Sequence, residues 1–267
     1  MASDAPILEL RDITVKFGDE TVYRDMSFSV REGEFLCILG PSGCGKSTSL
    51  RLIGDLLDVQ EGTVLVEGLP PREAWHKLAY VFQSPRLAPW RTALANVTLG
   101  MELRFDRTGK AEREATAKRY LSLVGLAADM HKYPGMLSGG DRQRVSIARA
   151  LAVHSDIILM DEPFSALDLN TRRRLRSELI SIWRETGKTI VFVTHDIDEA
   201  LTLADRILLL SNKPTRVLEV MSLDEERPRA LDTAPTLRAR RDQLVAMFEE
   251  LERNAPEENT QGKELAS

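Results

Sequence analysis

The feature that most constrains the fold of this chain is a glycine-rich loop between an apolar segment and a helical one. The loop reads GPSGCGKST at residues 40–48, directly after FLCIL (35–39) and before a helical pattern. A strand, a glycine-rich loop and a helix in this order are typical of a phosphate-binding loop. The alternative is a glycine-rich turn that only caps a helix, and the presence of all three parts together disfavours it.

Each residue type in the loop has a role in binding a nucleotide. The glycines allow a tight loop whose N–H groups surround the β-phosphate. Lys46 supplies a positive charge at the β- and γ-phosphates, and the hydroxyl of Ser47 is placed to ligate Mg²⁺. The residues expected around the nucleotide are Gly40, Pro41, Ser42, Gly43, Cys44, Gly45, Lys46, Ser47 and Thr48.

A second segment, IILMDEP (157–163), offers carboxylates at the end of an apolar strand. Successive residues at a strand end point in different directions. Asp161 can therefore face the metal ion while Glu162 faces the position of an attacking water. Taken alone, acidic pairs at strand ends are common, and the alternative is that Glu162 is an exposed loop acid.

Apolar segments of strand length alternate with longer helical patterns, which predicts an α/β domain. The segments 8–18 and 26–30 alternate as half-exposed antiparallel strands do, so a parallel core should carry an antiparallel flank. From about residue 84 to 155 helical patterns replace the strands, which predicts an inserted helical subdomain. Buried and mostly parallel strands are predicted at 35–39, 78–82, 157–160, 189–193 and 206–210.

The C-terminal part of the chain divides into a helix and a polar tail. One helical face carries Leu237, Leu244, Phe248 and Leu251, so we expect a packed C-terminal helix. The last residues, 254–267, are polar and are expected to be disordered. We therefore predict a main domain over 1–221, an extension over 222–253 and this tail.

Composition limits the class of protein and its partners. No apolar run approaches the ~20 residues needed to cross a bilayer, and the N-terminus does not resemble a signal peptide, so a cytosolic globular protein is expected. Cys37 and Cys44 are expected to be free thiols. The formal charge of −5 argues against a nucleic-acid partner, and we interpret the arginine run TRRRLR (171–176) as a solvated helix face.

With these motifs in place, the chain resembles an ATP-binding cassette (ABC) ATPase subunit from about residue 7 to 221. The resemblance rests on five segments in the order of that family: GPSGCGKST, LSGGDRQR (137–144), IILMDEP, SALD (165–168) and VTHD (193–196). It implies an α/β P-loop NTPase core of the RecA-like type with an antiparallel β flank and an inserted α-helical subdomain. It also implies hydrolysis of ATP with Mg²⁺ as cofactor.

The LSGG segment has free backbone N–H groups at a helix start, which suit an anion, yet no lysine accompanies it. The resemblance implies the reason: in this family the segment reaches the γ-phosphate bound by a second copy of the chain. Ser138, Gly139 and Gly140 would complete the partner's site in a head-to-tail dimer that encloses ATP.

The resemblance also assigns roles to single residues. His195 would hold the γ-phosphate and the attacking water, and Gln83 would reach the Mg²⁺ ion and that water. Asp168 would contact the partner chain, and Phe17 would stack on adenine. Many relatives have tyrosine in place of Phe17, and Asp141 after LSGG is also a departure, which we interpret as a structural residue at the helix start.

The segment QSPRLAPWRTALANV (83–97) resembles the group of nitrate, sulfonate, taurine and bicarbonate importers. This implies separate permease subunits that dock near residues 84–96, a solute-binding protein acting indirectly, and a place on the cytoplasmic face of the membrane. The alternative for Trp90 is that it anchors the helical subdomain. The alternative for the whole chain is an ABC ATPase without a membrane partner, of the iron–sulfur assembly type.

Overall fold

The protein is described here by a computed structural model, which describes residues 5–104, 108–165, 167–229, 231 and 234–254. Its centre is a six-stranded sheet in the order β5-β6-β7-β3-β8-β9. The first five of these strands are parallel, and β9 pairs antiparallel with β8. The strands are β5 (Leu78–Val81), β6 (Ile157–Asp161), β7 (Thr189–Thr194), β3 (Phe35–Leu39), β8 (Arg206–Leu210) and β9 (Val217–Ser222). The predicted parallel core is confirmed.

The predicted antiparallel flank is also confirmed, but it forms a sheet of its own. Its order is β2-β1-β4, and both pairings are antiparallel. The strands are β1 (Leu8–Phe17), β2 (Glu20–Val30) and β4 (Glu61–Val66). The sequence analysis missed β4 and β9. Neither strand has a long apolar run, because each exposes part of its length to solvent.

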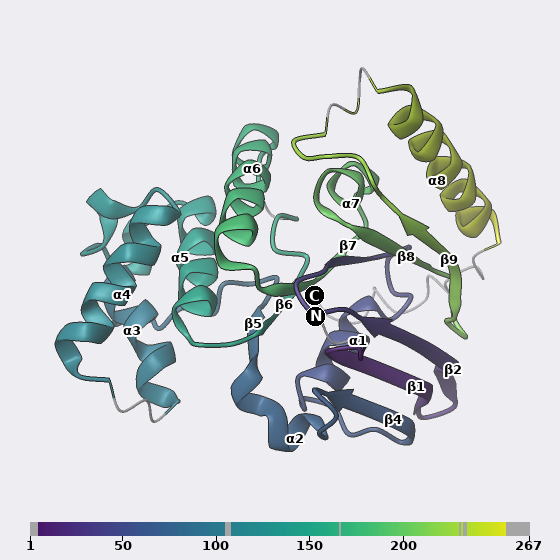
Figure 1. Ribbon diagram of the computed structural model, residues 1–267, viewed down its shortest axis with the longest axis horizontal. Coiled ribbons are helices and arrows are strands. Elements are labelled where there is room, and N and C mark those ends of the chain that lie inside the picture. The colour runs from purple at the N-terminus through teal and green to yellow at the C-terminus, as the bar shows by residue number, and fades with distance from the viewer. Residues whose placement is uncertain (1–4, 105–107, 166, 230, 232–233, 255–267) are drawn as a thin grey trace, which may run out of the picture.

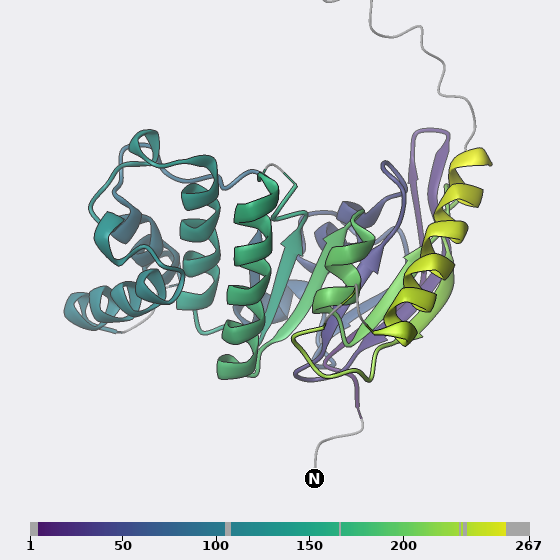
Figure 2. The ribbon, with the colours of Figure 1, turned by 90° about the horizontal axis from the view of Figure 1, so that it is seen from above.

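The helices divide between the inserted lobe and the face of the large sheet. In Figures 1 and 2 helices α3, α4 and α5 gather at one end of the molecule, which agrees with the predicted helical insertion. Helices α6, α7 and α8 cover one face of the sheet, whereas α1 lies on the other face beside the small sheet. The helices are α1 (Lys46–Ile53), α2 (Pro71–Ala74), α3 (Ala93–Leu103), α4 (Lys110–Leu123), α5 (Gly139–Ala152), α6 (Leu169–Thr186), α7 (Ile197–Leu203) and α8 (Pro235–Arg253), with short 3₁₀ turns at Trp75–Lys77, Ala127–Asp129 and Pro134–Met136.

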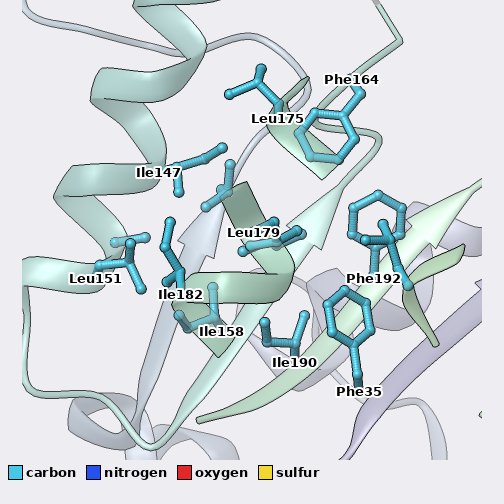
Figure 3. Packing of buried hydrophobic residues seen from close by; sticks show 14 of the residues in the cluster. Phe35, Ile147, Leu151, Ile158, Phe164, Leu175, Leu179, Ile182, Ile190 and Phe192 are labelled. Atoms are coloured by element: carbon cyan, nitrogen blue, oxygen red, sulfur yellow. The ribbon is translucent and has the colours of Figure 1, made fainter. Parts of the chain in front are cut away.

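The large sheet separates two apolar clusters because side chains alternate between its faces. Phe35, Cys37 and Leu39 of β3 point towards the helices on one face, whereas Leu36 and Ile38 pack with α1 and the small sheet. Figure 3 shows the first cluster, in which side chains of α6 lie between Phe35 and Phe192 of the sheet on one side and Ile147 and Leu151 of α5 on the other. Burial on both faces explains why these strands read as continuous apolar runs.

The C-terminal helix α8 is packed as predicted. Leu237 and Leu244 are fully buried, and Phe248 and Leu251 pack partly buried against the main cluster. Of the predicted tail only Asn254 is described, so the expectation of disorder lies outside the described residues. The division into domains at residue 221 stays a prediction.

Both cysteines are buried free thiols, as expected. Within the described part of the chain, every helix is too short or too polar to cross a bilayer.

Candidate functional site

The glycine-rich loop joins the buried strand β3 to α1, as the sequence predicted. Gly43 and Gly45 have φ angles of 76° and 106°, a region that disfavours residues with a Cβ atom. A Cβ atom on Gly45 would also lie 2.8 Å from Cγ1 of Val22, so the loop could not keep this path against β2. Glycine is therefore required at residue 45 by both conformation and space.

Two buried side chains that the sequence analysis missed hold the loop by donating hydrogen bonds to its carbonyl groups. The hydroxyl of Tyr23 in β2 donates to the carbonyl of Gly45, and the hydroxyl of Thr215 donates to the carbonyl of Cys44. Both side chains are fully buried, and burial raises the pKa of the Tyr23 hydroxyl. These two bonds fix the carbonyls of Gly45 and Cys44 and so hold the path of the loop.

Lys46 lies over the loop with its ammonium group in contact with main-chain oxygens. Nζ donates to the carbonyls of Gly40 at 2.9 Å and Pro41 at 2.8 Å, and it lies 3.9 Å from Oε1 of Glu162. The side chain is only 4% exposed. Such a desolvated ammonium group interacts strongly with a phosphate because water does not screen it.

Ser47 and Asp161, two of the three predicted metal ligands, are in direct contact. The Ser47 hydroxyl donates to Oδ1 of Asp161 at 2.7 Å, which joins the start of α1 to the end of β6. Burial raises the pKa of the Asp161 carboxyl, and the hydrogen bond from Ser47 partly opposes this shift. A hydroxyl and a carboxylate are the hard oxygen ligands that Mg²⁺ prefers, and two protein ligands are enough when phosphates supply others. These residues fit a Mg²⁺ ion bound together with a nucleotide.

Glu162 contacts His195, whereas Asp161 contacts Ser47, so the two carboxylates of the acidic pair have different partners. Oε2 of Glu162 lies 3.2 Å from Nδ1 of His195, and the Glu162 side chain is 18% exposed. The φ angle of Glu162 is 41°, an uncommon conformation for a residue other than glycine. Strained backbone of this kind, which costs ~1–3 kcal/mol, is concentrated at functional sites. The carboxylate can accept a proton from a water placed between it and a phosphate on Lys46.

Gln83 follows β5 at the same edge of the sheet. Its Nε2 donates to Oγ of Ser165 at 3.3 Å, and this hydroxyl donates to the carbonyl of Glu162 at 3.1 Å. The structure therefore connects Gln83 with Glu162 through Ser165. The predicted contact of Gln83 with Mg²⁺ stays a prediction.

Ser138 lies at the N-terminus of α5, in the helical lobe. Its hydroxyl accepts from the N–H of Asp141 at 3.1 Å and donates to Oδ2 of Asp141 at 2.7 Å. Ser138 is therefore the N-cap of α5, and Asp141 in the first turn holds the Ser138 hydroxyl, a structural role as expected. Gly139 and Gly140 form the first turn of α5, which does not lie beside α1 in either view (Figures 1 and 2). The predicted role of these three residues at a partner's nucleotide stays a prediction.

Asp168 and Phe17 are both exposed, as residues that contact a partner or a base must be. Asp168 caps α6 by accepting from the N–H groups of Asn170 and Thr171, each at 3.1 Å. The hydrogen bond with Thr171 lowers the pKa of Asp168. Phe17 is 47% exposed at the end of β1, which leaves its ring free to stack.

Trp90 does not anchor the helical lobe, so that alternative is wrong. Its side chain is 76% exposed, the largest exposed fraction among the large hydrophobic side chains of the described residues. Nearby, the same stretch of chain is held by Asn96, which exchanges hydrogen bonds with the main chain of Ala88. Asn96 therefore holds the main chain of this segment, while the side chain of Trp90 stays exposed to solvent.

The interpretation of the arginine run as a solvated face is wrong for two of its members. Arg173 and Arg174 are exposed, but Arg172 and Arg176 point inward from α6 and pair with Asp196 at 3.2 and 3.0 Å. Asp196 lies far from Arg172 and Arg176 in the sequence, so a local sequence pattern does not reveal these ion pairs. The only signal was the spacing of Arg172 and Arg176, which places both on one helical face.

A comparison with protein families supports the same site. A family model described as ABC transporter matches residues 23–165, which is more than half of the chain and includes the phosphate loop, LSGG and Glu162.

Several relatives are similar over most of their length. The bicarbonate transport ATP-binding protein CmpD of Synechocystis is 44% identical over 216 residues, which are 80% of this chain and 77% of that protein. The nitrate import ATP-binding protein NrtD of Synechococcus elongatus is 41% identical over 79% of this chain and 78% of its own. The taurine import ATP-binding protein TauB of Yersinia pestis is 39% identical over 90% of this chain and 96% of its own.

Among solved structures, the chain is similar to an ATP-binding cassette described as a dimeric post-hydrolysis state bound to ADP and Pi. The TM-score is 0.72 with 36% identity, over 82% of this chain and 100% of the other. The motifs, the geometry around Lys46 and Glu162 and these similarities agree, and the chain belongs to the ABC transporter family as an ATP-hydrolysing cassette.

Proposed function

We propose that this chain is the ATPase subunit of an importer for a small anion such as nitrate, bicarbonate, taurine or another sulfonate. The observation that carries the proposal is the similarity to import ATP-binding proteins, which extends over 96% of the taurine relative. The chain would work on the cytoplasmic face of the membrane, attached through permease subunits that receive anion from a solute-binding protein.

In this function the residues of one chain prepare ATP for attack by water. The loop N–H groups and Lys46 would hold the phosphates, and Ser47 with Asp161 would hold Mg²⁺. The ion supplies charge neutralisation at the phosphates when it is bound. Glu162 would take a proton from the attacking water, and His195, 3.2 Å from it, would orient Glu162 and hold the γ-phosphate. Gln83 would complete this group from the end of β5, and Phe17 would stack on the adenine.

The second half of each nucleotide site would come from another copy of the chain. Ser138, Gly139 and Gly140 start α5 with free N–H groups at the positive end of a 14-residue helix. A head-to-tail dimer would place this helix start against the γ-phosphate held by the partner. The dimeric cassette to which the chain is similar supports this arrangement.

The permease would dock beside residues 84–96. The exposed Trp90 offers a large apolar contact there, and exposed aromatic side chains are typical anchors of protein interfaces. A groove of about 380 Å³ lies close to this segment and is lined by Phe82, Arg86 and Leu103 among others. The guanidinium of Arg86 lies 4.2 Å from the centre of the Phe82 ring, so one wall combines an aromatic ring with a positive charge.

Isolation of the tagged full-length chain from native membranes, followed by reconstitution in vesicles, tests this function. We expect integral membrane subunits to co-purify and to catalyse ATP-dependent uptake of labelled nitrate, bicarbonate or taurine. The matched control carries Glu162→Gln and should assemble equally while transporting little. A chain that hydrolyses ATP but associates with no integral membrane subunit would instead support the iron–sulfur assembly alternative.

A further inference from the structure

A partly buried ion-pair network includes Asp196, the residue that follows His195, and the hydrolysis mechanism does not use this network. Oδ2 of Asp196 accepts from Arg172 at 3.2 Å and from Arg176 at 3.0 Å. Arg176 also donates to Oε1 of Glu199 at 3.0 Å, and Nε of Arg172 lies 3.7 Å from the same oxygen. Two positive and two negative groups therefore balance in a region where Arg176 and Glu199 are less than 10% exposed.

The network holds the residues on both sides of His195. The hydroxyl of Thr194 donates to Oε2 of Glu199 at 2.7 Å, and the N–H of Asp196 donates to the Thr194 hydroxyl at 3.0 Å. The other carboxylate oxygen of Asp196 accepts from the N–H of Glu199 at 2.9 Å and caps α7. The imidazole of His195 is thus carried by a main chain that is fixed one residue before it and one residue after it.

Arg172 extends this network to the loop that precedes α6. Its NH2 group donates to the carbonyl of Leu167 at 3.2 Å, while its NH1 group donates to Asp196. Leu167 precedes Asp168, the residue expected to contact the partner chain. One rigid guanidinium therefore connects the start of α6 with the residue after His195, and a lysine could not make both contacts with the same geometry.

We propose that Arg172 is a positioning residue that transmits closure of the dimer at Asp168 to the orientation of His195. This inference rests on the proposed function, in which Asp168 lies at the dimer interface. Displacement of Leu167 and Asp168 by the partner would move the guanidinium. Because a buried, charge-balanced network loses much free energy when one partner leaves, Asp196 would follow it. Closure of the dimer would then fix His195 in the orientation in which it faces Glu162.

Arg173 provides a matched control within the same arginine run. It is exposed on α6, and its side chain makes no hydrogen bond or ion pair with the described residues. Arg172→Met and Arg173→Met remove the same charge from neighbouring positions of one helix. Only the first removes the connection between Leu167 and Asp196. Arg176 remains in Arg172→Met and keeps Asp196 and Glu199 paired, so the variant should fold.

The first measurement is the steady-state hydrolysis of ATP by the full chain. We expect Arg172→Met to lower kcat about tenfold, equivalent to ~1.4 kcal/mol. KM for ATP should stay near wild type, because Arg172 lies away from the phosphate loop. Tm of Arg172→Met should fall, because the network loses one of its two positive charges, so kcat is compared at a temperature at which circular dichroism shows both Met variants to be folded. Arg173→Met should match wild type, and Arg172→Lys should recover only part of kcat. An equal fall in both Met variants, or a change in KM without kcat, would overturn the proposal.

A double-mutant cycle that combines Arg172→Met with Asp168→Asn tests whether Asp168 acts through Arg172. Asparagine is chosen because it retains the cap of α6. If Asp168 acts through Arg172, kcat of the double variant should lie within about twofold of Arg172→Met alone. If kcat of the double variant instead falls by the product of the two single losses, the two residues act independently and the proposal fails.

A second measurement does not depend on turnover. In the Glu162→Gln background, ATP should protect the peptide 193–200 from hydrogen exchange, and Arg172→Met should lose this protection while its dimer still forms. Equal protection with and without Arg172 in a verified dimer would contradict this inference alone. If the Glu162→Gln chain with Arg172 intact forms no dimer in the presence of ATP, this result would instead contradict the proposed function, and the inference with it.

Discussion

Nδ1 of His195 lies 3.2 Å from Oε2 of Glu162, which joins the end of β7 to the end of β6. The two strands are neighbours in the parallel sheet, so their carboxyl ends meet at one edge. Lys46 reaches the same carboxylate from the phosphate loop after β3, which pairs with the other side of β7. The order of strands in the sheet therefore brings together the three groups that we propose act on the terminal phosphate.

Replacement of Glu162 by glutamine should slow hydrolysis by about 10² or more, the loss typical of a removed general base. ATP binding should persist because glutamine preserves the shape of the side chain and leaves Lys46 in place. The chain should then accumulate as an ATP-bound dimer, which size-exclusion chromatography with retained nucleotide can measure. Near-normal turnover in the assembled complex would exclude the proposed role.

Asp161→Asn should raise the Tm of the nucleotide-free chain at pH 7.5 by a few degrees while abolishing Mg²⁺-dependent hydrolysis. Burial raises the pKa of Asp161 above its ordinary 3.8, so ionisation in the folded state costs free energy. This cost is fully present above the folded pKa and disappears as the pH falls below 3.8. Asparagine avoids the cost and still accepts the hydrogen bond from Ser47.

The thermal measurement should be repeated at decreasing pH, where the advantage of Asp161→Asn must shrink. Asp224→Asn, which changes an exposed aspartate, is the control for the loss of one negative charge. A lower Tm for Asp161→Asn than for wild type at pH 7.5 would contradict the argument.

Trp90→Ala should weaken attachment to the permease without changing the Tm, because a side chain that is 76% exposed contributes little to folding. Binding to the isolated permease subunits can be measured by surface plasmon resonance in detergent. Leu218→Ala on the exposed face of β9 is a comparable control far from the docking segment in sequence. If Trp90→Ala lowers the Tm and leaves permease affinity unchanged, the docking role is wrong.

Mixed dimers test whether the LSGG segment acts on the partner's nucleotide. Lys46→Ala and Ser138→Arg should each prevent ATP retention in homodimers, because both sites of each homodimer carry the lesion. In a mixed dimer one site has both lesions, and the other combines intact Lys46 of one chain with intact Ser138 of the other. We therefore expect one composite site to retain ATP.

The measurement is nucleotide retention by differently tagged chains, since hydrolysis can require two intact sites. If the segment acted on its own chain's nucleotide, every site would keep a lesion and mixing would rescue nothing. Folded heterodimers that retain no more ATP than either homodimer would refute the assignment of Ser138, Gly139 and Gly140.

The sequence by itself determined the parallel core, the phosphate loop, the acidic pair at the end of β6 and the helical lobe. These features depend on neighbours in the chain: a strand buried on both faces is a continuous apolar run, and a phosphate loop needs glycines beside a lysine. The packed face of α8 was also visible, because helical periodicity places Leu237 and Leu244 on one side.

Only the tertiary structure decided which polar groups meet across elements. Tyr23 under the phosphate loop, Ser165 between Gln83 and Glu162, and Arg172 between Leu167 and Asp196 are partners from different elements. Apart from the spacing of Arg172 and Arg176 on one helical face, the local pattern does not show which arginine turns inward to a carboxylate and which faces water, as Arg172 and Arg173 illustrate. The difference is made by the position of α7 beside α6, which places Asp196 within reach of one arginine and not of the other.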